Sequence, residues 1–206
     1  KGTRITETFY GIDVDGYANG HISVSGSNRT YWVEGDVVVN NCIINMSKDF
    51  YDEPEESDDF YEFIVDMKLQ SGTGVEFFWP TQKFPVLRAY ADRNQIVTIN
   101  FDSSTETFNI DGNVDFKGGD IFYFSNNFFI RNGQLFFHEN QDKFDPRITV
   151  NAEMRTINRN NEKVRVLFIL DNSPLSNFQP RIESVPALTQ AELYELLGDT
   201  IMGGDP

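Results

Sequence analysis

The alternation of apolar and polar residues between Phe108 and Phe116 constrains the fold of this chain more than any other feature. Every even position in this stretch is apolar or Gly, and every odd position is polar. A period of two is typical of a β-strand that turns one face to an apolar environment and the other to water. At ~3.3 Å per residue such a strand is on the order of 30 Å long. The stretch therefore predicts one long strand with an apolar face.

The residues that follow continue the pattern as shorter strands. The turn-favouring segment Ser125–Asn127 separates Ile121–Phe124 from Phe128–Ile130. Asn132-Gly133 predicts a tight hairpin turn into Leu135–Phe137, because Asn and Gly adopt positive φ at little cost. We therefore expect a long antiparallel meander with one face rich in Phe. Both faces of Ile121–Phe124 are apolar, so its inward side stays open.

The rest of the chain alternates in the same way between turns rich in Gly. Val37 and Val39 share one parity, whereas Cys42 and Ile44 share the other. This change predicts a β-bulge or a turn at Asn40-Asn41. Further strands are predicted at residues 5–15, 20–26, 31–46, 63–69, 75–79, 87–92, 95–101, 148–155 and 164–170.

Two segments depart from the strand pattern. Residues 48–62 are dense in Asp and Glu around Pro54, which is typical of a solvated loop inserted between two parts of one sheet. Residues 189–198 predict a short amphipathic helix. It begins with a capping box of Thr189 and Glu192, and Gly198 is placed as its stop. The predicted class is all-β with one C-terminal helix whose apolar stripe is Leu193, Leu196 and Leu197.

Composition limits both the architecture and the partners of the chain. Only 39% of the 206 residues are apolar, yet the chain contains 19 Phe, which favours one domain built on a thin curved sheet. The net charge of −15 argues against attraction to nucleic acid or to an anionic membrane surface. No apolar run approaches the ~20 residues of a membrane-spanning helix. The single cysteine, Cys42, is interpreted as a buried hydrophobic residue.

The sequence carries little that predicts catalysis. His21 and His138 are the only histidines, and neither has the spacing of a metal pair or a catalytic triad. The chain has no P-loop, no dinucleotide-binding glycine pattern and no nucleophile elbow. We therefore expect a protein that is not an enzyme and that uses no cofactor and no metal.

An ordered series of short motifs runs through the second half of the chain, namely Gly119-x-Ile121-x-Tyr123, Phe128-x-Ile130, Gly133-x-Leu135-x-Phe137, Pro146-x-Ile148-x-Val150-x-Ala152, Val164-x-Val166-x-Phe168 and Ser184-x-Pro186-x-Leu188-Thr-Gln190. By this series the chain, from about Val75 to the C-terminus or roughly 130 residues, resembles the C-terminal domain of the TamB family of translocation and assembly module proteins, which are related to AsmA-like proteins. Two departures stand out: Asn172 lies where the family pattern has Gly, and the acidic loop is not a family feature.

This resemblance implies a β-taco, a long sheet folded lengthwise into an open trough that is apolar inside and polar outside. It further implies a protein anchored in the inner membrane of a Gram-negative envelope, with this domain in the periplasm near the outer membrane. The implied partners are phospholipid acyl chains and an outer-membrane protein of the Omp85 class, TamA or a BamA-like protein. The implied role is to carry phospholipid between the two membranes and to assist outer-membrane biogenesis.

The apolar faces of the predicted strands supply candidates for a lipid-binding groove. A continuous apolar wall lowers the cost of moving an acyl chain through water, which is about 0.8 kcal/mol for each methylene. The candidate residues are Val97, Ile99, Phe101, Phe108, Ile110, Val114, Phe116, Phe128, Ile130, Leu135, Phe137, Ile148, Val150, Ala152 and Met154.

Two alternatives remain open from the residues alone, and a tendency to self-associate is predicted beside them. The same alternation suits the closed core of a β-sandwich or barrel that acts as a binding or adhesion module. It also suits a chaperone that pairs an open sheet edge with a strand of an outer-membrane protein. A fragment of a longer sheet would also expose strand edges and self-associate.

Overall fold

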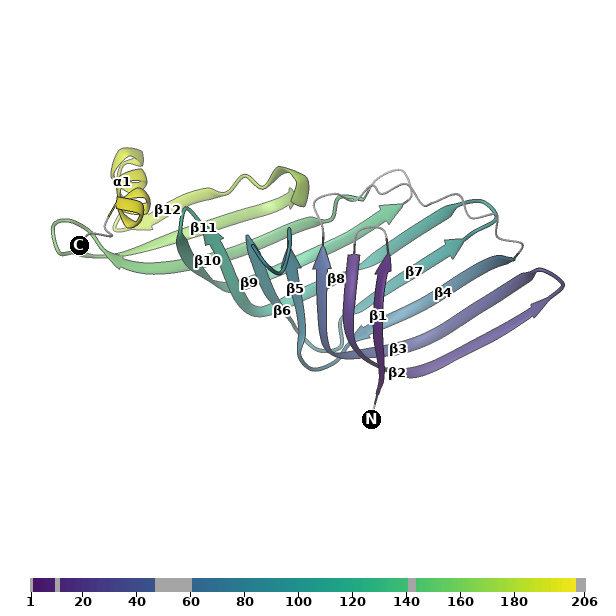
Figure 1. Ribbon diagram of the computed structural model, residues 1–206. Helices are drawn as coiled ribbons and strands as arrows, with labels where there is room; N and C mark the ends of the chain where they lie inside the picture. The colour runs from purple at the N-terminus through teal and green to yellow at the C-terminus, as the bar shows by residue number, and fades with distance from the viewer. Residues whose placement is uncertain (1, 10–11, 47–60, 141–143, 203–206) are drawn as a thin grey trace.

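The computed structural model describes residues 2–9, 12–46, 61–140 and 144–202, and the side chains of all of these except Phe9 and residues 199–202. The predicted all-β class with a C-terminal helix is confirmed (Figure 1). Residues 48–60 of the predicted acidic loop lie outside the described residues. The elements are β1 (Thr3–Phe9), β2 (Ile12–Ser27), β3 (Thr30–Met46), β4 (Glu62–Ser71), β5 (Val75–Trp79), β6 (Leu87–Ala91), β7 (Ile96–Asp102), β8 (Thr107–Tyr123), β9 (Asn126–Asn140), β10 (Arg147–Ile157), β11 (Lys163–Pro174), the 3₁₀ helix η1 (Leu175–Asn177), β12 (Arg181–Val185) and α1 (Gln190–Met202).

All twelve strands belong to one mixed sheet. Its main path runs β1-β2-β3-β4-β7-β8-β9-β10-β11-β12, and β5 and β6 form a second connection between β3 and β8. The sheet is not the purely antiparallel meander that was expected, because β3 runs parallel to both β4 and β5. A parallel pair needs a long connection, and residues 47–61 between β3 and β4 are enough for one.

The fork arises because two long strands change partners along their length. The first part of β3 pairs with β4, and its last residues pair with β5. The first part of β8 likewise pairs with β7 and the remainder with β6. The bulge predicted at Asn40-Asn41 lies at the change in β3, where Asn41 has a φ of 44°. Figure 1 shows the long strands bending there, so that two walls face each other.

Gly112 marks the corresponding change in β8. It is the last residue of β8 paired with β7, and its φ is 147°. A Cβ there would lie 2.5 Å from the carbonyl oxygen of Ile96, so the close approach of β7 requires glycine.

The hairpin predicted at Asn132-Gly133 is wrong. β9 runs without interruption past these residues, and both pair with β10. Gly133 serves close packing instead, because a Cβ there would meet Phe116 at 3.0 Å and Val150 at 3.1 Å. The predicted turn at residues 125–127 is present one residue earlier, where Phe124 and Ser125 both have positive φ.

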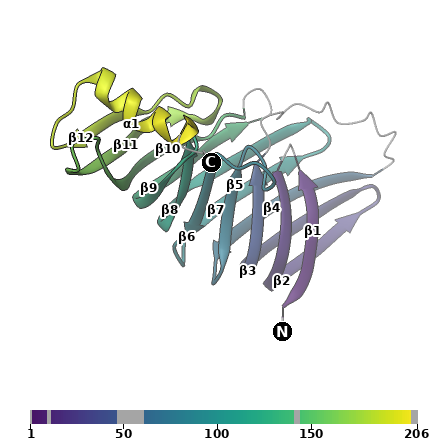
Figure 2. The same ribbon diagram turned by 60° about the vertical axis from the view of Figure 1, so that its left-hand side comes forward.

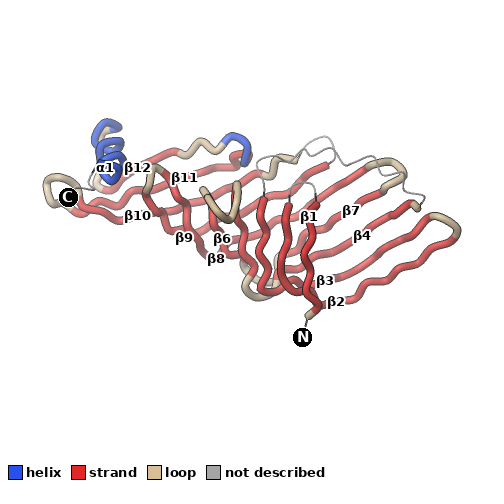
Figure 3. Tube along the Cα trace, viewed as in Figure 1, coloured by secondary structure: helices blue, strands red, loops and turns tan. Residues whose placement is uncertain are grey.

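Helix α1 begins as the sequence predicts. The Thr189 hydroxyl accepts from the backbone N–H of Glu192 at 3.3 Å, and the Glu192 carboxylate accepts from the backbone N–H of Thr189 at 2.8 Å. Leu193 and Leu197 are buried against the sheet, as expected. The predicted stop at Gly198 is wrong, because the helix continues to Met202. Figures 2 and 3 show α1 beside the C-terminal strands.

The two ends of the sheet bury their apolar faces differently. Around β8–β11, side chains such as Phe128, Phe168 and Val150 are fully buried, and α1 and η1 add Leu193, Leu197 and Leu175 to the same core. We call this region the closed part. Around β1, β2, β4 and β7, apolar side chains such as Met67 and Ile99 are only half-buried, whereas β3 between them buries Val37, Val39 and Cys42. No helix among the residues that the structure describes is long and apolar enough to cross a membrane.

Candidate functional site

An apolar groove lies between the two walls formed by the N-terminal strands. It is an open cavity of about 450 Å³, within the ~300–1,000 Å³ typical of ligand sites. The alternation of each strand points every second side chain into it, which explains why almost all of its lining is apolar. Its apolar lining is Ile5, Ile12, Val14, Ala18, Ile22, Val37, Val39, Cys42, Ile44, Val65, Met67, Leu69, Val75, Phe77, Val97, Ile99, Phe101, Ile110, Val114 and Phe137.

Most polar side chains that line the groove are already satisfied within the protein. The buried Ser71 hydroxyl donates to the carbonyl of Asp92 at 2.6 Å and accepts from the backbone N–H of Gln95 at 2.9 Å. The Gln95 side chain accepts from the backbone N–H of Asp115 at 3.2 Å, and Gln70 donates to Asn94 at 2.8 Å. These polar groups already have hydrogen-bond partners within the protein. The groove therefore offers a ligand apolar contact in preference to polar recognition.

Aromatic rings separate the groove from the closed part. Phe77 at the groove lies 6.1 Å from Phe116, measured between ring centroids. Beyond them Trp79 stacks on Phe178 at 5.2 Å, and Phe178 lies 5.9 Å from Phe168. The segment after η1 thus covers the apolar face of the closed part, whereas the N-terminal strands leave the corresponding face open as the groove.

The structure divides the predicted groove residues between these two environments. Val97, Ile99, Phe101, Ile110, Val114 and Phe137 line the groove. The other nine are buried and do not line it; they are Phe108, Phe116, Phe128, Ile130, Leu135, Ile148, Val150, Ala152 and Met154. The sequence did not predict which side of Ile121–Phe124 faces inward. In the structure Ile121 is buried and Phe122 is exposed.

Sequence reasoning missed the part of the groove formed by β1–β5. The alternation of Val37 and Val39, and of Cys42 and Ile44 beyond the bulge, carried the signal. The sequence does not show that these strands face β7 and β8 across a bend. That arrangement depends on the fork at β3. Asn172, the departure from the family pattern, has a φ of 46°, in the left-handed region that Gly favours and Asn tolerates.

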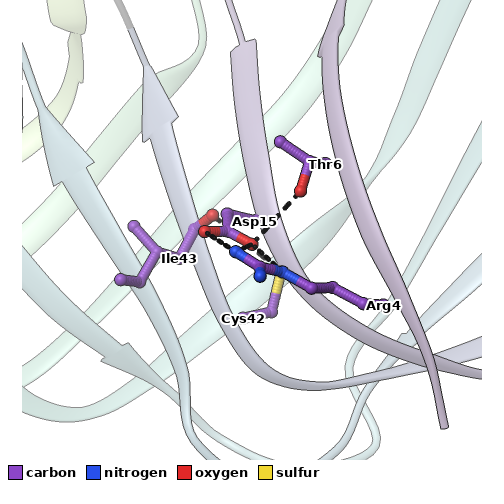
Figure 4. A network of polar contacts seen from close by, with 5 residues as sticks. All are labelled: Arg4, Thr6, Asp15, Cys42 and Ile43. Carbon is purple, nitrogen blue, oxygen red and sulfur yellow. Dashed lines mark hydrogen bonds and ion pairs between the residues drawn. The ribbon is translucent and has the colours of Figure 1, made fainter.

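Cys42 lies in the wall of the groove beside a polar network that joins β1 to β2 (Figure 4). Arg4 pairs with Asp15 at 3.3 Å, and the Thr6 hydroxyl donates to the same carboxylate at 3.4 Å. Burial, with a smaller contribution from Asp15, raises the pKa of the Cys42 thiol to about 11. The thiol is therefore protonated at neutral pH and behaves as an apolar wall group.

The histidines do not join the groove. His138 is exposed, and its Nδ1 lies 2.6 Å from an oxygen of Asp111; His21 is exposed on β2. Within the described part of the chain, no three His, Cys, Asp or Glu side chains gather where they could hold a metal ion. What the arrangement offers chemically is an apolar surface rather than a reacting group.

Neither a model of a known protein family nor a curated protein matches the chain. The resemblance to the TamB family is therefore supported only by the ordered residues quoted above.

Proposed function

We propose that the chain is a lipid-transfer module that holds the acyl chains of phospholipids in the groove. The observation that supports this proposal is an open cavity of about 450 Å³ whose lining is almost wholly apolar. Exposed apolar clusters of this size on a folded protein mark binding sites, since leaving them in water is unfavourable.

The energetic argument concerns the acyl chain as well as the protein. A chain of about 16 carbons costs on the order of 10 kcal/mol to expose to water. The polar lining of the groove is limited to Glu7 and to Thr8, Gln70, Ser71 and Gln95, which hydrogen-bond within the protein. The long apolar remainder lowers the cost of exposing the acyl chain without holding the lipid at one position. Such a surface suits a lipid that is passed on rather than one that is kept.

The location and the partner of the protein belong to the same proposal. By its resemblance to the TamB family, the protein would act in the periplasm between the two membranes. It would meet an Omp85-class outer-membrane protein at its distal end and contribute to outer-membrane biogenesis. The proposal involves no catalytic residue and no cofactor.

The test is photo-crosslinking from Met67 or from Ile99, which lie half-buried in the groove, and the substitution Ile99→Asp is made in the protein that carries the crosslinker at Met67. We expect crosslinks to phospholipid, identified by mass spectrometry, and a loss of at least tenfold in the Asp variant, because a carboxylate in the groove repels the acyl chain. Thr98→Asp is the matched control, since Thr98 is adjacent on β7 but points to the opposite face, next to Lys68.

Crosslinking that is equal in both variants, or no crosslink to lipid from either position, would contradict the proposal. Crosslinking from the buried Val150 is the negative control, because its side chain is not exposed. Circular dichroism of both variants checks that each is folded.

A second candidate function is strand addition to a client protein. Only residues 12–18 of β2 pair with β1, so among the described strands the edge of β2 from residue 19 to 27 has no partner. Ile22 and Val24 are exposed on this edge. A strand peptide from an outer-membrane protein that binds wild-type protein and Ile99→Asp equally well would favour this alternative.

A further inference from the structure

The charge of the chain is divided unevenly along the sheet. The whole chain carries −15, but residues 146–185, which include β10, β11 and β12, contain six Arg or Lys and four Asp or Glu, a net charge of +2. The remaining residues therefore carry −17. The positive segment lies at the end of the sheet that is farthest from β1.

Basic side chains gather on the outer face of β9, β10 and β11. Arg155 and Arg165 lie directly opposite each other, an arrangement that is unfavourable for like charges. Arg131 projects from a bulge in β9 toward the same place. We call Arg131, Arg155, Lys163 and Arg165 the basic patch. Their neighbours in sequence, such as Met154, Val164 and Val166, are buried in the closed part, so the basic patch faces away from that core.

One buried carboxylate holds three of these side chains together. Glu153 is only 8% exposed, and its oxygens lie 2.7 Å from Arg131, 3.4 Å from Arg155 and 3.7 Å from Arg165. A single negative charge shared among three guanidinium groups leaves a net charge of +2, to which Lys163 adds one more. The ion-pair network therefore positions the Arg side chains but does not neutralise them.

Exposed apolar side chains lie next to the basic patch on the same face. Phe129 is 52% exposed and lies opposite Glu153, and Val185 is 50% exposed and lies opposite Arg165. Ile157, opposite Lys163, is 55% exposed. Guanidinium groups match the geometry of phosphates, and apolar side chains favour the interface between headgroups and acyl chains.

Acidic neighbours reduce this charge but do not cancel it. Glu183 on β12 is paired with Arg181 at 2.8 Å. Asp120 on β8 lies opposite Phe129 and accepts from the neutral amide of Asn127 at 3.0 Å, so its negative charge remains, and the basic patch with Glu153 and Asp120 has a net charge of +2.

The other acidic side chains of the outer face lie farther away, namely Asp111 and Asp115 on β8, Asp102 on β7 and Asp66 on β4. The nearest of them along β8 is Asp115, opposite Gln134, which is three residues or roughly 10 Å from Arg131 on β9. This separation exceeds the Debye length of about 8 Å at physiological salt.

We propose that the basic patch with its flanking Phe129, Ile157 and Val185 docks the protein on an anionic membrane surface. This inference rests on the proposed function and extends it by naming the surface through which the C-terminal end meets the membrane. Net charge alone argues against such docking. Docking is nevertheless possible because positive and negative charges are separated along the sheet. Only the basic end then needs to approach the lipid.

The test is binding of the protein to vesicles of phosphatidylglycerol and phosphatidylcholine, measured by cosedimentation. We expect binding that is lost with pure phosphatidylcholine vesicles and that weakens as salt is raised. The variant is Arg155→Gln with Arg165→Gln, which keeps the closest pair of Glu153, that with Arg131. Because each Arg near an anionic surface raises membrane affinity about fivefold, the affinity of this double variant should fall roughly 25-fold.

The matched control is Lys83→Gln with Arg93→Gln, two exposed residues outside the basic patch that lower the net charge by the same amount. It should bind within about twofold of the wild-type protein. Absence of binding by the wild-type protein, or undiminished binding by the double Arg variant, would overturn the proposal. Release from vesicles by inorganic phosphate at constant ionic strength would indicate a site for free phosphate and would also overturn it.

Vesicle binding does not depend on lipid entering the groove. Ile99→Asp should therefore bind vesicles normally while losing lipid crosslinks. The two proposals can consequently fail separately.

Discussion

At the scale of single residues, Glu153 is the most constrained ionisable group of the outer face. It is buried between β9 and β11 and would be unfavourable there without partners. The hydrogen bond from Arg131, together with the charges of Arg131, Arg155 and Arg165, lowers the pKa of this carboxyl below its usual range. The charged form of Glu153 therefore stabilises the folded protein.

This shift predicts the sign of a pH effect on stability. A lowered folded-state pKa contributes stability above the unfolded pKa, about 4.3 for Glu, and that stability is lost as pH falls through the folded value. The Glu153→Gln variant should therefore have a lower melting temperature than the wild-type protein at pH 7, and this difference should become smaller below about pH 4. Thermal melts followed by circular dichroism from pH 7 to pH 3 measure the difference in melting temperature. A difference of constant size across that range would contradict the assignment.

At the scale of elements, the C-terminal helix is joined to the sheet by two different kinds of interaction. Its start is held by the reciprocal bonds of Thr189 and Glu192, and its apolar stripe packs against the closed part through Leu193 and Leu197. Asn126 at the start of β9 also donates to the carbonyl of Leu197 at 3.0 Å. The helix completes the core of the C-terminal strands.

Removing the cap should weaken that attachment. Thr189→Ala is expected to lower the free energy of unfolding by about 1 kcal/mol, because one backbone N–H of the first turn loses its acceptor. Thr189→Ser keeps the hydroxyl and should lie within about 0.5 kcal/mol of the wild-type protein. Urea unfolding measures both variants. If Ala and Ser behave alike, the capping box does not stabilise the helix.

At the scale of the whole molecule, one sheet serves two purposes. The C-terminal strands bury their apolar face under α1, η1 and the rings around Phe178, whereas the N-terminal strands leave theirs as the groove. The fork at β3 and β8 separates the walls, and the bulge at Asn41 bends the sheet between them. The closed part should therefore carry most of the stability.

This division predicts unequal costs for two large-to-small substitutions. Phe128→Ala in the closed part should lower the free energy of unfolding by about 3–5 kcal/mol, because it leaves a cavity around a fully buried ring. Met67→Ala in the groove should cost less than about 1.5 kcal/mol, since part of that side chain already meets water. Urea unfolding of lipid-free protein compares them. Equal costs would mean that the groove is closed in solution.

Most of the strands, the capped start of the helix and the apolar parity of most strands could be predicted from the sequence, because they depend on local periodicity and on side-chain chemistry close in the chain. The strand β12 was not predicted, and the inward side of residues 121–124 was left open. The sequence also located the bulge at Asn40-Asn41. It misplaced the turn at Asn132-Gly133, since only the pairing with β10 and the crowding by Phe116 and Val150 show why Gly stands there.

Which apolar faces are covered depends on the three-dimensional arrangement of the sheet and could not be predicted from alternation. Phe128 and Ile99 alternate in the same way along their strands, yet one is sealed within the closed part and the other lines the groove. That difference comes from elements distant in sequence, namely the fork of β3 and β8 and the position of α1 and η1. Alternation gives the direction of a side chain, whereas its burial depends on what the folded chain brings across from it.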